Sequence, residues 1–136
     1  MNFPADLKYS RNDEWVRVED PRQGVEGSTA TSGITDYAQD QLSDIVYVEL
    51  PAVGDTFKQG ETWGSVESVK AASDVYLPVS GAITAVNEAL SSAPEVVNSD
   101  PYGKGWMVKF TIANAAELDG LMDAAAYAKY CEERKS

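Results

Sequence analysis

The sequence predicts a mainly β protein with short helices at its edges and a helix near its C-terminus. Short runs in which apolar and polar residues alternate, separated by glycine and proline, occupy residues 15–18 and most of 45–83. The hydrophobic period then changes to that of a helix over a segment of about 115–133. With 136 residues, 43% of them hydrophobic, the chain has the size and composition of a single globular domain, 1–136.

Two stretches have the pattern of strands. Trp15-Val16-Arg17-Val18 alternates apolar and polar residues, and the turn formers Pro21, Gly24 and Gly27 after it predict a hairpin loop. Within residues 45–83 the alternation returns in short pieces that proline and glycine separate. We therefore expect short strands to dominate the middle of the chain.

Two segments are predicted to be helical. Thr35 or Asp36 is expected to cap a short helix that runs through Leu42, with Gln39 in the position of a capping box. The C-terminal helix has an apolar face with helical spacing, formed by Leu118, Leu121, Met122 and Ala125.

The balance of charge argues against two classes of partner. Twenty-two acidic residues against eleven basic ones give a net charge of −11, which repels nucleic-acid phosphates and anionic lipids. No run reaches the roughly 20 apolar residues of a membrane helix, and residues 1–10 lack the basic start and apolar stretch of a secretory signal. We therefore expect a cytoplasmic protein with no nucleic-acid or membrane partner.

Missing residue types exclude most enzyme chemistry. The chain has no histidine, which is the usual base in Ser-His and Cys-His chemistry and the commonest metal ligand. Cys131 is the single cysteine, so an intrachain disulfide and paired thiolate ligands are excluded. Calcium-loop, dinucleotide-binding and P-loop motifs are also absent. We expect a non-catalytic protein without a metal.

Lys70 is the candidate functional residue. The stretch from Gly64 to Val75 runs from strand pattern through small and polar residues and back into strand pattern, which predicts a hairpin with Lys70 near its tip. Glu67, Asp74 and the negative net charge favour the ammonium form, so Lys70 is a poor unaided nucleophile but a reasonable substrate for enzymatic acylation. On geometry alone, an ordinary exposed turn lysine is the simpler interpretation.

Several sequence blocks together favour a functional role for Lys70. In order along the chain they are Asp13-Glu14-Trp15-Val16, Gly33-Ile34-Thr35-Asp36, Asp44 to Pro51, Val66 to Val75, Pro78-Val79-Ser80-Gly81, Asn98 to Gly103 and Gly105-Trp106-Met107. In order and spacing these blocks resemble those of the glycine cleavage system H-protein family, over nearly the whole length of the chain.

The resemblance implies a flattened hybrid barrel-sandwich of the lipoyl and biotinyl carrier type, with lipoate in amide linkage to Lys70. In that family the lipoyl arm receives the aminomethyl group of glycine from a pyridoxal-phosphate-dependent glycine decarboxylase (P-protein). A tetrahydrofolate-dependent aminomethyltransferase (T-protein) then takes the carbon, and the flavin enzyme dihydrolipoyl dehydrogenase (L-protein) reoxidises the arm. A lipoylating enzyme is a further implied partner.

The resemblance also suggests roles for residues besides the lysine. Glu67, Ser68, Val69 and Ala71 match the stretch around the modified lysine and are interpreted either as the surface that the lipoylating enzyme recognises or as simple hairpin formers. Glu14 matches a family acid near the place where the loaded arm rests, where a carboxylate can hold the cationic amine. An exposed acid at the start of a strand is the alternative interpretation of Glu14.

Three departures from the family limit this transfer of roles. Asp13 stands where many relatives have histidine, and Tyr37 stands where some do, so hydrogen bonds from those rings are absent or replaced. Residues 28–32 are more polar than the usual strand of the family, which leaves the packing of that strand open.

Three other functions remain in consideration. A lipoyl relay that donates lipoate to 2-oxo-acid dehydrogenases has the same fold, and the sequence does not separate it from the shuttle. A biotinyl domain is disfavoured, because Val69 and Ala71 stand where biotin carriers usually have methionine. An unmodified β-barrel interaction module, in which Lys70 is incidental, is an alternative from a different class.

Overall fold

The structure is a computed structural model that describes residues 1–19 and 26–134. The strands in these residues are β1 (Lys8–Tyr9), β2 (Glu14–Val18), β3 (Thr29–Ile34), β4 (Ile45–Glu49), β5 (Thr56–Phe57), β6 (Thr62–Ser68), β7 (Ala72–Tyr76), β8 (Gly81–Val86) and β9 (Val108–Ile112). The helices are α1 (Asp36–Leu42), α2 (Val96–Ser99) and α3 (Ala124–Arg134), with 3-10 helices η1 (Glu88–Ser91) and η2 (Ala115–Gly120). Pro21 and Gly24 of the predicted hairpin loop lie outside the described residues.

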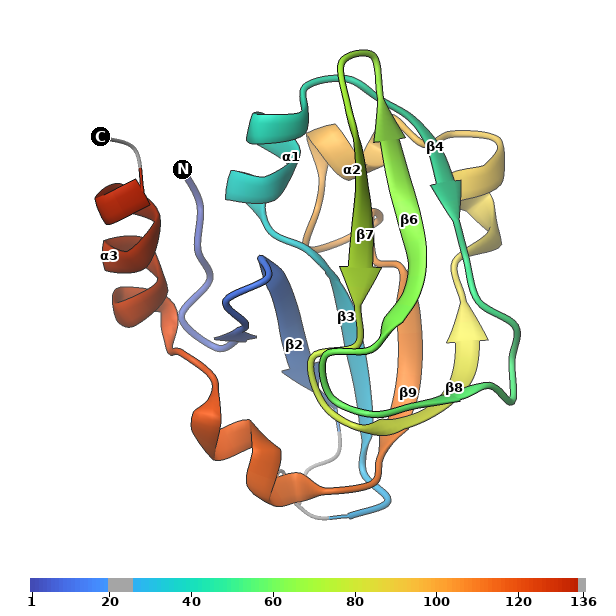
Figure 1. Cartoon of the computed structure of the whole chain (residues 1–136), viewed down its shortest axis with the longest axis vertical. Helices are drawn as coiled ribbons and strands as arrows, with labels where there is room; N and C mark the ends of the chain where they lie inside the picture. The colour runs from blue at the N-terminus through green and yellow to red at the C-terminus, as the bar shows by residue number, and fades with distance from the viewer. Residues whose placement is uncertain (20–25, 135–136) are drawn as a thin grey trace.

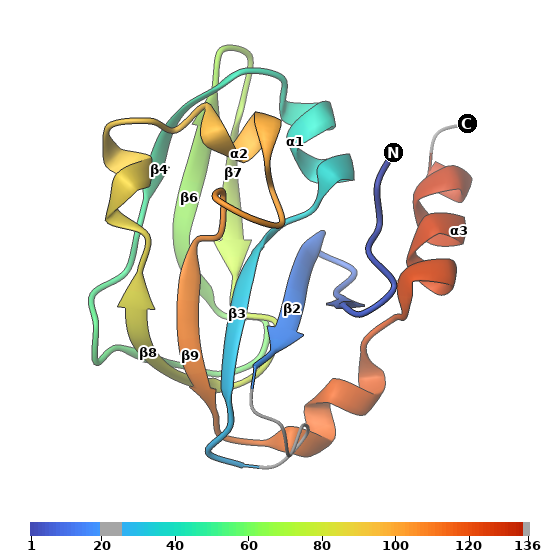
Figure 2. The same cartoon turned by 180° about the vertical axis from the view of Figure 1, so that it is seen from behind.

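The strands form two stacked sheets in which every pairing is antiparallel. One sheet has the strand order β1-β2-β3-β9-β8-β5 and the other has the order β4-β6-β7. In Figure 1 the hairpin of β6 and β7 lies in front of β3 and β9, and Figure 2 shows the larger sheet from behind. The helices lie around the edges of the sheets. The predicted mainly β fold, a flattened sandwich with peripheral helices and a C-terminal helix, is confirmed.

The short helix α1 begins where the sequence predicts. Thr35 is its N-cap, and the Thr35 hydroxyl accepts a 3.2 Å hydrogen bond from the backbone N–H of Ala38. The side chain of Gln39 does not reach back to the cap, because its amide donates to Asp36 Oδ1 at 2.7 Å. Thr35 rather than Asp36 therefore caps the helix.

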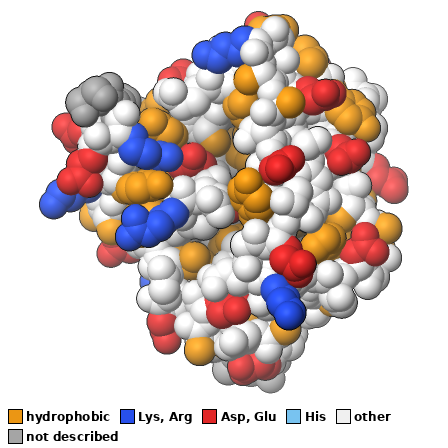
Figure 3. Space-filling model, in the orientation of Figure 1, with side chains coloured by type: hydrophobic (Ala, Val, Ile, Leu, Met, Phe, Trp, Pro, Cys, Tyr) orange, Lys and Arg blue, Asp and Glu red, His pale blue; other side chains and the backbone are white. Residues whose placement is uncertain are grey.

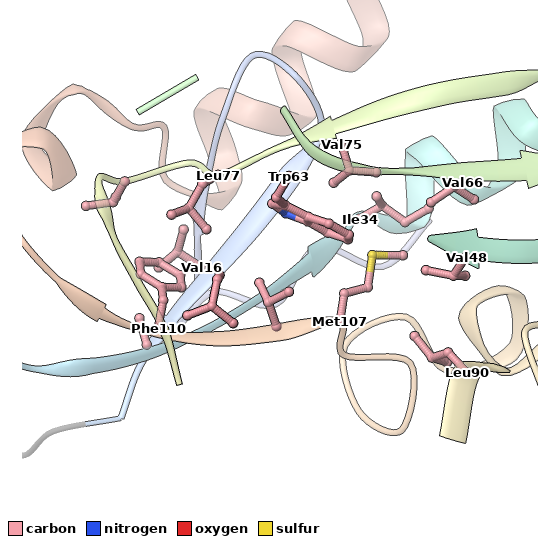
Figure 4. Close-up of a cluster of buried hydrophobic side chains, with 14 of the residues drawn as sticks. Val16, Ile34, Val48, Trp63, Val66, Val75, Leu77, Leu90, Met107 and Phe110 are labelled. Atoms are coloured by element: carbon pink, nitrogen blue, oxygen red, sulfur yellow. The ribbon is translucent and has the colours of Figure 1, made fainter. Parts of the chain in front are cut away.

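The main core fills the space between the two sheets (Figure 4). Trp63 and Val66 of β6 face Ile34 of β3, and Phe110 of β9 lies in the same layer. Full burial of an aliphatic or aromatic side chain of this kind stabilises a fold by about 1.5–3 kcal/mol. The apolar side chains of β6 therefore hold the smaller sheet, and with it the hairpin, on the larger one.

The polar strand β3 is well packed, although the sequence left its packing open. It lies between β2 and β9, and its side chains at Ala30, Thr31 and Ser32 are at most 2% exposed. The Thr31 hydroxyl donates a 2.8 Å hydrogen bond to Glu19 Oε2, which is paired at 3.0 Å with the ammonium of Lys109. The Thr31 hydroxyl is thus satisfied, whereas the buried hydroxyl of Ser28, just before the strand, has no hydrogen-bond partner among the described residues.

The C-terminal helix packs against the N-terminal segment through a second, largely aromatic cluster. The buried members of this cluster are Leu7, Tyr9, Trp15, Tyr37, Tyr102, Tyr127 and Cys131. The rings of Tyr9 and Tyr127 are stacked with their centroids 4.7 Å apart. Between η2 and α3 the backbone of Met122 pairs with that of Tyr9 through two 2.8 Å hydrogen bonds, so the helical segment is interrupted there.

The described residues contain neither a membrane-spanning helix nor a metal-binding cluster. Among residues 1–19 and 26–134 no helix combines the length and the apolar character needed to cross a membrane. The same residues contain no group of three or more Cys, Asp or Glu side chains arranged to hold a metal ion.

Candidate carrier site

Lys70 lies at the tip of the β6–β7 hairpin, as the sequence predicts. The register of the two strands runs to the pair Glu67 and Ala72, and beyond it Val69 and Lys70 form the turn. Figure 1 shows this hairpin projecting beyond α1 at one end of the molecule. Lys70 is exposed, and its ammonium has no hydrogen bond or ion pair with residues 1–19 or 26–134. The amine is therefore accessible to a modifying enzyme.

The Ser68 side chain stabilises the turn. Two-residue hairpin loops usually need residues with positive φ, but neither Val69 nor Lys70 has a positive φ. Ser68 Oγ instead accepts hydrogen bonds from the N–H groups of Lys70 at 3.3 Å and Ala71 at 3.0 Å. The Ser68 N–H donates to the Ala71 carbonyl at 2.7 Å. One hydroxyl thus satisfies two turn amides that the strands leave without a partner.

A neighbouring loop also supports the tip. The Val69 N–H donates a 3.0 Å hydrogen bond to the Asp44 carbonyl, between α1 and β4. Asn98 of α2 holds both sides of Asp44: its Oδ1 accepts from Ile45 N at 2.8 Å and its Nδ2 donates to the Ser43 carbonyl at 2.9 Å. Asn98 therefore positions the lysine indirectly.

The residues flanking Lys70 divide into two groups. Glu67, Val69 and Ala71 are exposed, and Val69 is among the most exposed large apolar side chains of the described residues, at 67%. Ser68 is half-buried and forms the turn. On the face shown in Figure 3, acidic side chains are spread among exposed apolar ones, with a basic side chain at the end where the hairpin projects. The exposed residues are available for recognition, whereas the Ser68 hydroxyl has a structural task.

Glu14 is buried, so the alternative interpretation as an exposed acid at a strand start is wrong. Its side chain is 1% exposed. Ser10 Oγ donates to Glu14 Oε1 at 2.6 Å, and the backbone N–H of Tyr76 on β7 donates to Oε2 at 3.2 Å. Burial raises the pKa of Glu14 to about 8, against the two hydrogen bonds, which lower it, and with a smaller upward effect of the negative charge of Asp13.

A cleft of about 150 Å³ opens beside Glu14. Its walls are the turn at 12–14, helix α1 with Ala38 and Leu42, and the stem of the hairpin with Ser73. Ser73 is three residues from Lys70, which corresponds to roughly 10 Å along a strand. An acyl arm on Lys70 can therefore fold back along β7 into this cleft, where Glu14 is the buried carboxylate.

The two positions at which the sequence departs from histidine meet at one residue of the C-terminal helix. The guanidinium of Arg134 pairs with the Asp13 carboxylate at 2.6 and 3.2 Å. Its Cζ lies 4.5 Å from the ring centroid of Tyr37 and 4.0 Å from that of Tyr130. The Asp13 carboxylate also accepts a 2.8 Å hydrogen bond from the hydroxyl of Tyr127. Asp13 and Tyr37 therefore share Arg134 as a partner, through an ion pair and a ring contact respectively.

Sequence reasoning missed three residues that shape the site: Ser10, Asn98 and Arg134. Ser10 has no motif around it, and its role depends on a turn that brings it back to Glu14. Arg134 acts on a residue 121 positions away in sequence. Asn98 does lie in the block from Asn98 to Gly103 that resembles the H-protein family. Its amide side chain, directly before a turn, was the available sequence signal for its role.

An exposed lysine at a hairpin tip, on a sandwich of two antiparallel sheets, is the arrangement of a carrier domain that bears a covalent arm. The profile of the glycine cleavage H-protein family matches residues 7–134, and the chain belongs to this family. It is 58% identical to the glycine cleavage system H protein of Chromobacterium violaceum over 128 residues, 94% of this chain and 95% of the relative. It is 54% identical to that of Symbiobacterium thermophilum over 132 residues, 97% and 98% of the two chains.

A solved structure agrees with the family assignment. The crystal structure of a glycine cleavage system H protein from Mycobacterium marinum superposes with a TM-score of 0.81 and 35% sequence identity. The match covers 94% of this chain and 98% of the other one. The predicted family is thus confirmed by sequence and by fold.

Proposed function

We propose that this protein is the lipoylated carrier of a glycine cleavage system and that Lys70 bears the lipoyl group. The observation that carries the proposal is the exposed ammonium of Lys70, which has no partner among the described residues, at a hairpin tip in a member of the H-protein family. The proposed role is that of a carrier rather than an enzyme. When bound, the lipoyl group supplies a disulfide whose sulfur accepts the aminomethyl group derived from glycine and then gives it up.

The residues of the chain fit this group. Ser68 and the Asp44 carbonyl fix the backbone of the tip, so the arm starts from a defined point. The cleft between α1 and β7 gives the arm a resting place out of solvent, and Glu14 offers a carboxylate for the cationic amine. Tethering the arm to one protein converts successive bimolecular encounters into reactions at high effective concentration.

The proposal extends to the partners. Glycine decarboxylase would load the arm, the aminomethyltransferase would unload it, and dihydrolipoyl dehydrogenase would reoxidise it. We propose that the lipoylating enzyme recognises the exposed side chains of Glu67, Val69 and Ala71, while Ser68 contributes by shaping the turn. We place these encounters in the cytoplasm, which suits the single, free and buried Cys131.

We also propose that residues 1–136 act as one domain. Met122 pairs with Tyr9, and α3 packs on the N-terminal segment through the aromatic cluster, so the two ends of the chain support each other. A single cooperative unfolding transition with coincident fluorescence and far-UV circular dichroism curves is expected. Two separate transitions would contradict it.

Intact mass spectrometry of the protein from its native host tests the modification. We expect a lipoyl mass increment that maps to Lys70, and its complete loss in the Lys70→Arg variant, which keeps the charge. Lys58→Arg is the matched control, because Lys58 is also exposed in a loop and should leave the increment intact. A wholly unmodified pool would favour the interaction module instead.

Reconstitution separates the shuttle from the relay. With glycine, tetrahydrofolate, NAD and the three partner enzymes, the lipoylated protein should support release of carbon dioxide and reduction of NAD. A protein that transfers lipoate to a 2-oxo-acid dehydrogenase but fails in this assay would be the relay.

A further inference from the structure

We propose that Arg134, at the end of α3, is a positioning residue for the Glu14 cleft: it occupies the carboxylate of Asp13 and so leaves Glu14 as the carboxylate that faces the arm. The role assigned to the arm rests on the proposed function. The arrangement of Arg134, Asp13 and Glu14 is independent of the proposed function.

Asp13 and Glu14 are consecutive acids that both line the cleft but have different partners. Glu14 is bonded to Ser10 and to the backbone of Tyr76. Asp13 Oδ1 accepts from Tyr127 and Arg134, and its Oδ2 accepts a second hydrogen bond from Arg134. The helix α3 therefore supplies the side-chain partners of Asp13, and α3 lies on the other side of the turn from β7 (Figure 1).

The backbone of Asp13 is held in an unusual conformation. Its φ is +68°, a region that residues other than glycine rarely adopt. Its carbonyl accepts a 3.0 Å hydrogen bond from Thr35 N, directly before α1. Since Glu14 follows at once, the conformation of Asp13 sets the direction from which Glu14 enters β2, and the bidentate pair with Arg134 stabilises that conformation.

Arg134 also affects the charge around Glu14. The other charged side chains that line the hollows beside Glu14, in the described part of the chain, are Asp13, Asp74 and Arg11. Asp13 is the one whose negative charge raises the pKa of Glu14. Arg134 neutralises this charge at 2.6 Å. Without Arg134 the carboxylate of Asp13 would act on Glu14 unopposed and would compete for the cationic amine.

The test is the titration of Glu14, followed by carbon-13 NMR of its carboxyl group in the full chain without lipoate. In Arg134→Gln we expect the Glu14 midpoint to rise by about 0.5 to 1 pH unit. Lys129→Gln is the matched control, because it removes an exposed charge from the same helix, and it should leave the midpoint unchanged. Arg134→Lys should fall between the wild type and Arg134→Gln.

The double variant Asp13→Asn/Arg134→Gln distinguishes positioning by charge from simple support of the fold. Because it also removes the charge that Arg134 opposes, its Glu14 midpoint should return toward the wild-type value. An unchanged midpoint in Arg134→Gln, or a midpoint that stays raised in the double variant, would overturn the proposal. If Arg134→Gln does not fold, the double variant and Arg134→Lys still give the comparison.

Lipoylated protein then tests the link to the arm. A shift of half a pH unit changes the ionised fraction of Glu14 about threefold, so the loaded arm of Arg134→Gln should lose its cargo about threefold faster. If the Glu14 midpoint shifts but the lifetime of the loaded arm does not, Arg134 positions Glu14 as proposed. The proposal that the loaded arm rests beside Glu14 is then wrong.

Discussion

The hydroxyl of Ser10 donates a 2.6 Å hydrogen bond to Oε1 of Glu14, and both side chains are buried. The same hydroxyl oxygen accepts a 3.1 Å hydrogen bond from the Glu14 backbone N–H. Ser10 thus binds both the carboxyl group and the backbone of Glu14. Burial raises the pKa of this acid to about 8. At neutral pH the resting protein therefore holds Glu14 mainly in its protonated form, and a cationic amine in the cleft favours loss of that proton.

The stability of the protein should depend on pH through Glu14. The pKa is about 8 in the folded protein against 4.5 for an ordinary glutamate, so the folded state keeps a proton that the unfolded state releases. The contribution of this group is then fully present below about pH 4.5 and is lost as the pH rises through 8. Glu14→Gln mimics the protonated form, so its stability relative to wild type should increase from pH 5 to 8 by a few kcal/mol. Urea unfolding at several pH values measures this, and a pH-independent difference would contradict it.

The lifetime of the loaded arm should also depend on pH through Glu14. A carboxylate holds a cationic amine better than a neutral acid does, so the hold should strengthen as the pH rises toward 8. We expect the ratio of wild-type to Glu14→Gln lifetimes to increase several-fold between pH 6 and 8. Lifetimes are measured without the tetrahydrofolate-dependent enzyme, and the variant serves as the control for chemistry that does not involve Glu14. Equal lifetimes at every pH would remove Glu14 from the resting place.

Asn98→Ala should loosen the hairpin tip from a distance. The amide of Asn98 makes hydrogen bonds to the backbone on both sides of Asp44, and the Asp44 carbonyl accepts from Val69. We expect a loss of about 2 kcal/mol in stability together with faster hydrogen exchange at the Val69 amide. Ser99→Ala, at an exposed neighbouring position of α2, is the control. If Val69 exchange stays at the wild-type rate while stability falls, the supporting chain of contacts is wrong.

Gly64→Ala should force β4 and β6 apart. A Cβ at Gly64 would overlap the backbone carbonyl oxygen of Glu49 on the neighbouring strand. Because a backbone atom cannot swing away as a side chain does, we expect a loss of about 2–3 kcal/mol in thermal or urea unfolding. Gly120→Ala has free space around the new methyl group and an ordinary backbone conformation, so it should change stability by less than about 1 kcal/mol.

Local patterns were enough to predict β2, α1 and the position of Lys70, whereas β1, β9 and α2 were not predicted. These predictions rest on the alternation around Val16, the cap at Thr35 and the small residues after Lys70. Each of these patterns involves residues that are only a few positions apart in the sequence. The local pattern does not predict which group is attached to Lys70, because an ordinary solvated turn lysine has the same local pattern. That part depended on resemblance across many blocks, which the family profile and the solved relative support.

The electrostatics of the site could not be predicted because they depend on distant partners. Glu14 is buried by the approach of Tyr76, which is 62 positions away. The interruption before α3 likewise arises because Met122 pairs with Tyr9 on β1, a contact that no helical periodicity reports. The hydrophobic period of the sequence predicts where strands and helices lie along the chain. These contacts depend instead on how the strands and helices pack against one another.

The turn at Val69 and Lys70 contains no glycine and no residue with positive φ, and its amides are tied to Ser68 and Asp44. The anchoring backbone would therefore contribute little to the movement of the proposed arm, which would come from rotation about the single bonds of the lysine side chain and of the acyl chain attached to it. A fixed anchor limits the volume through which the reactive end searches, while leaving its orientation free. Accuracy of delivery is thus a property of the protein, and reach is a property of the cofactor.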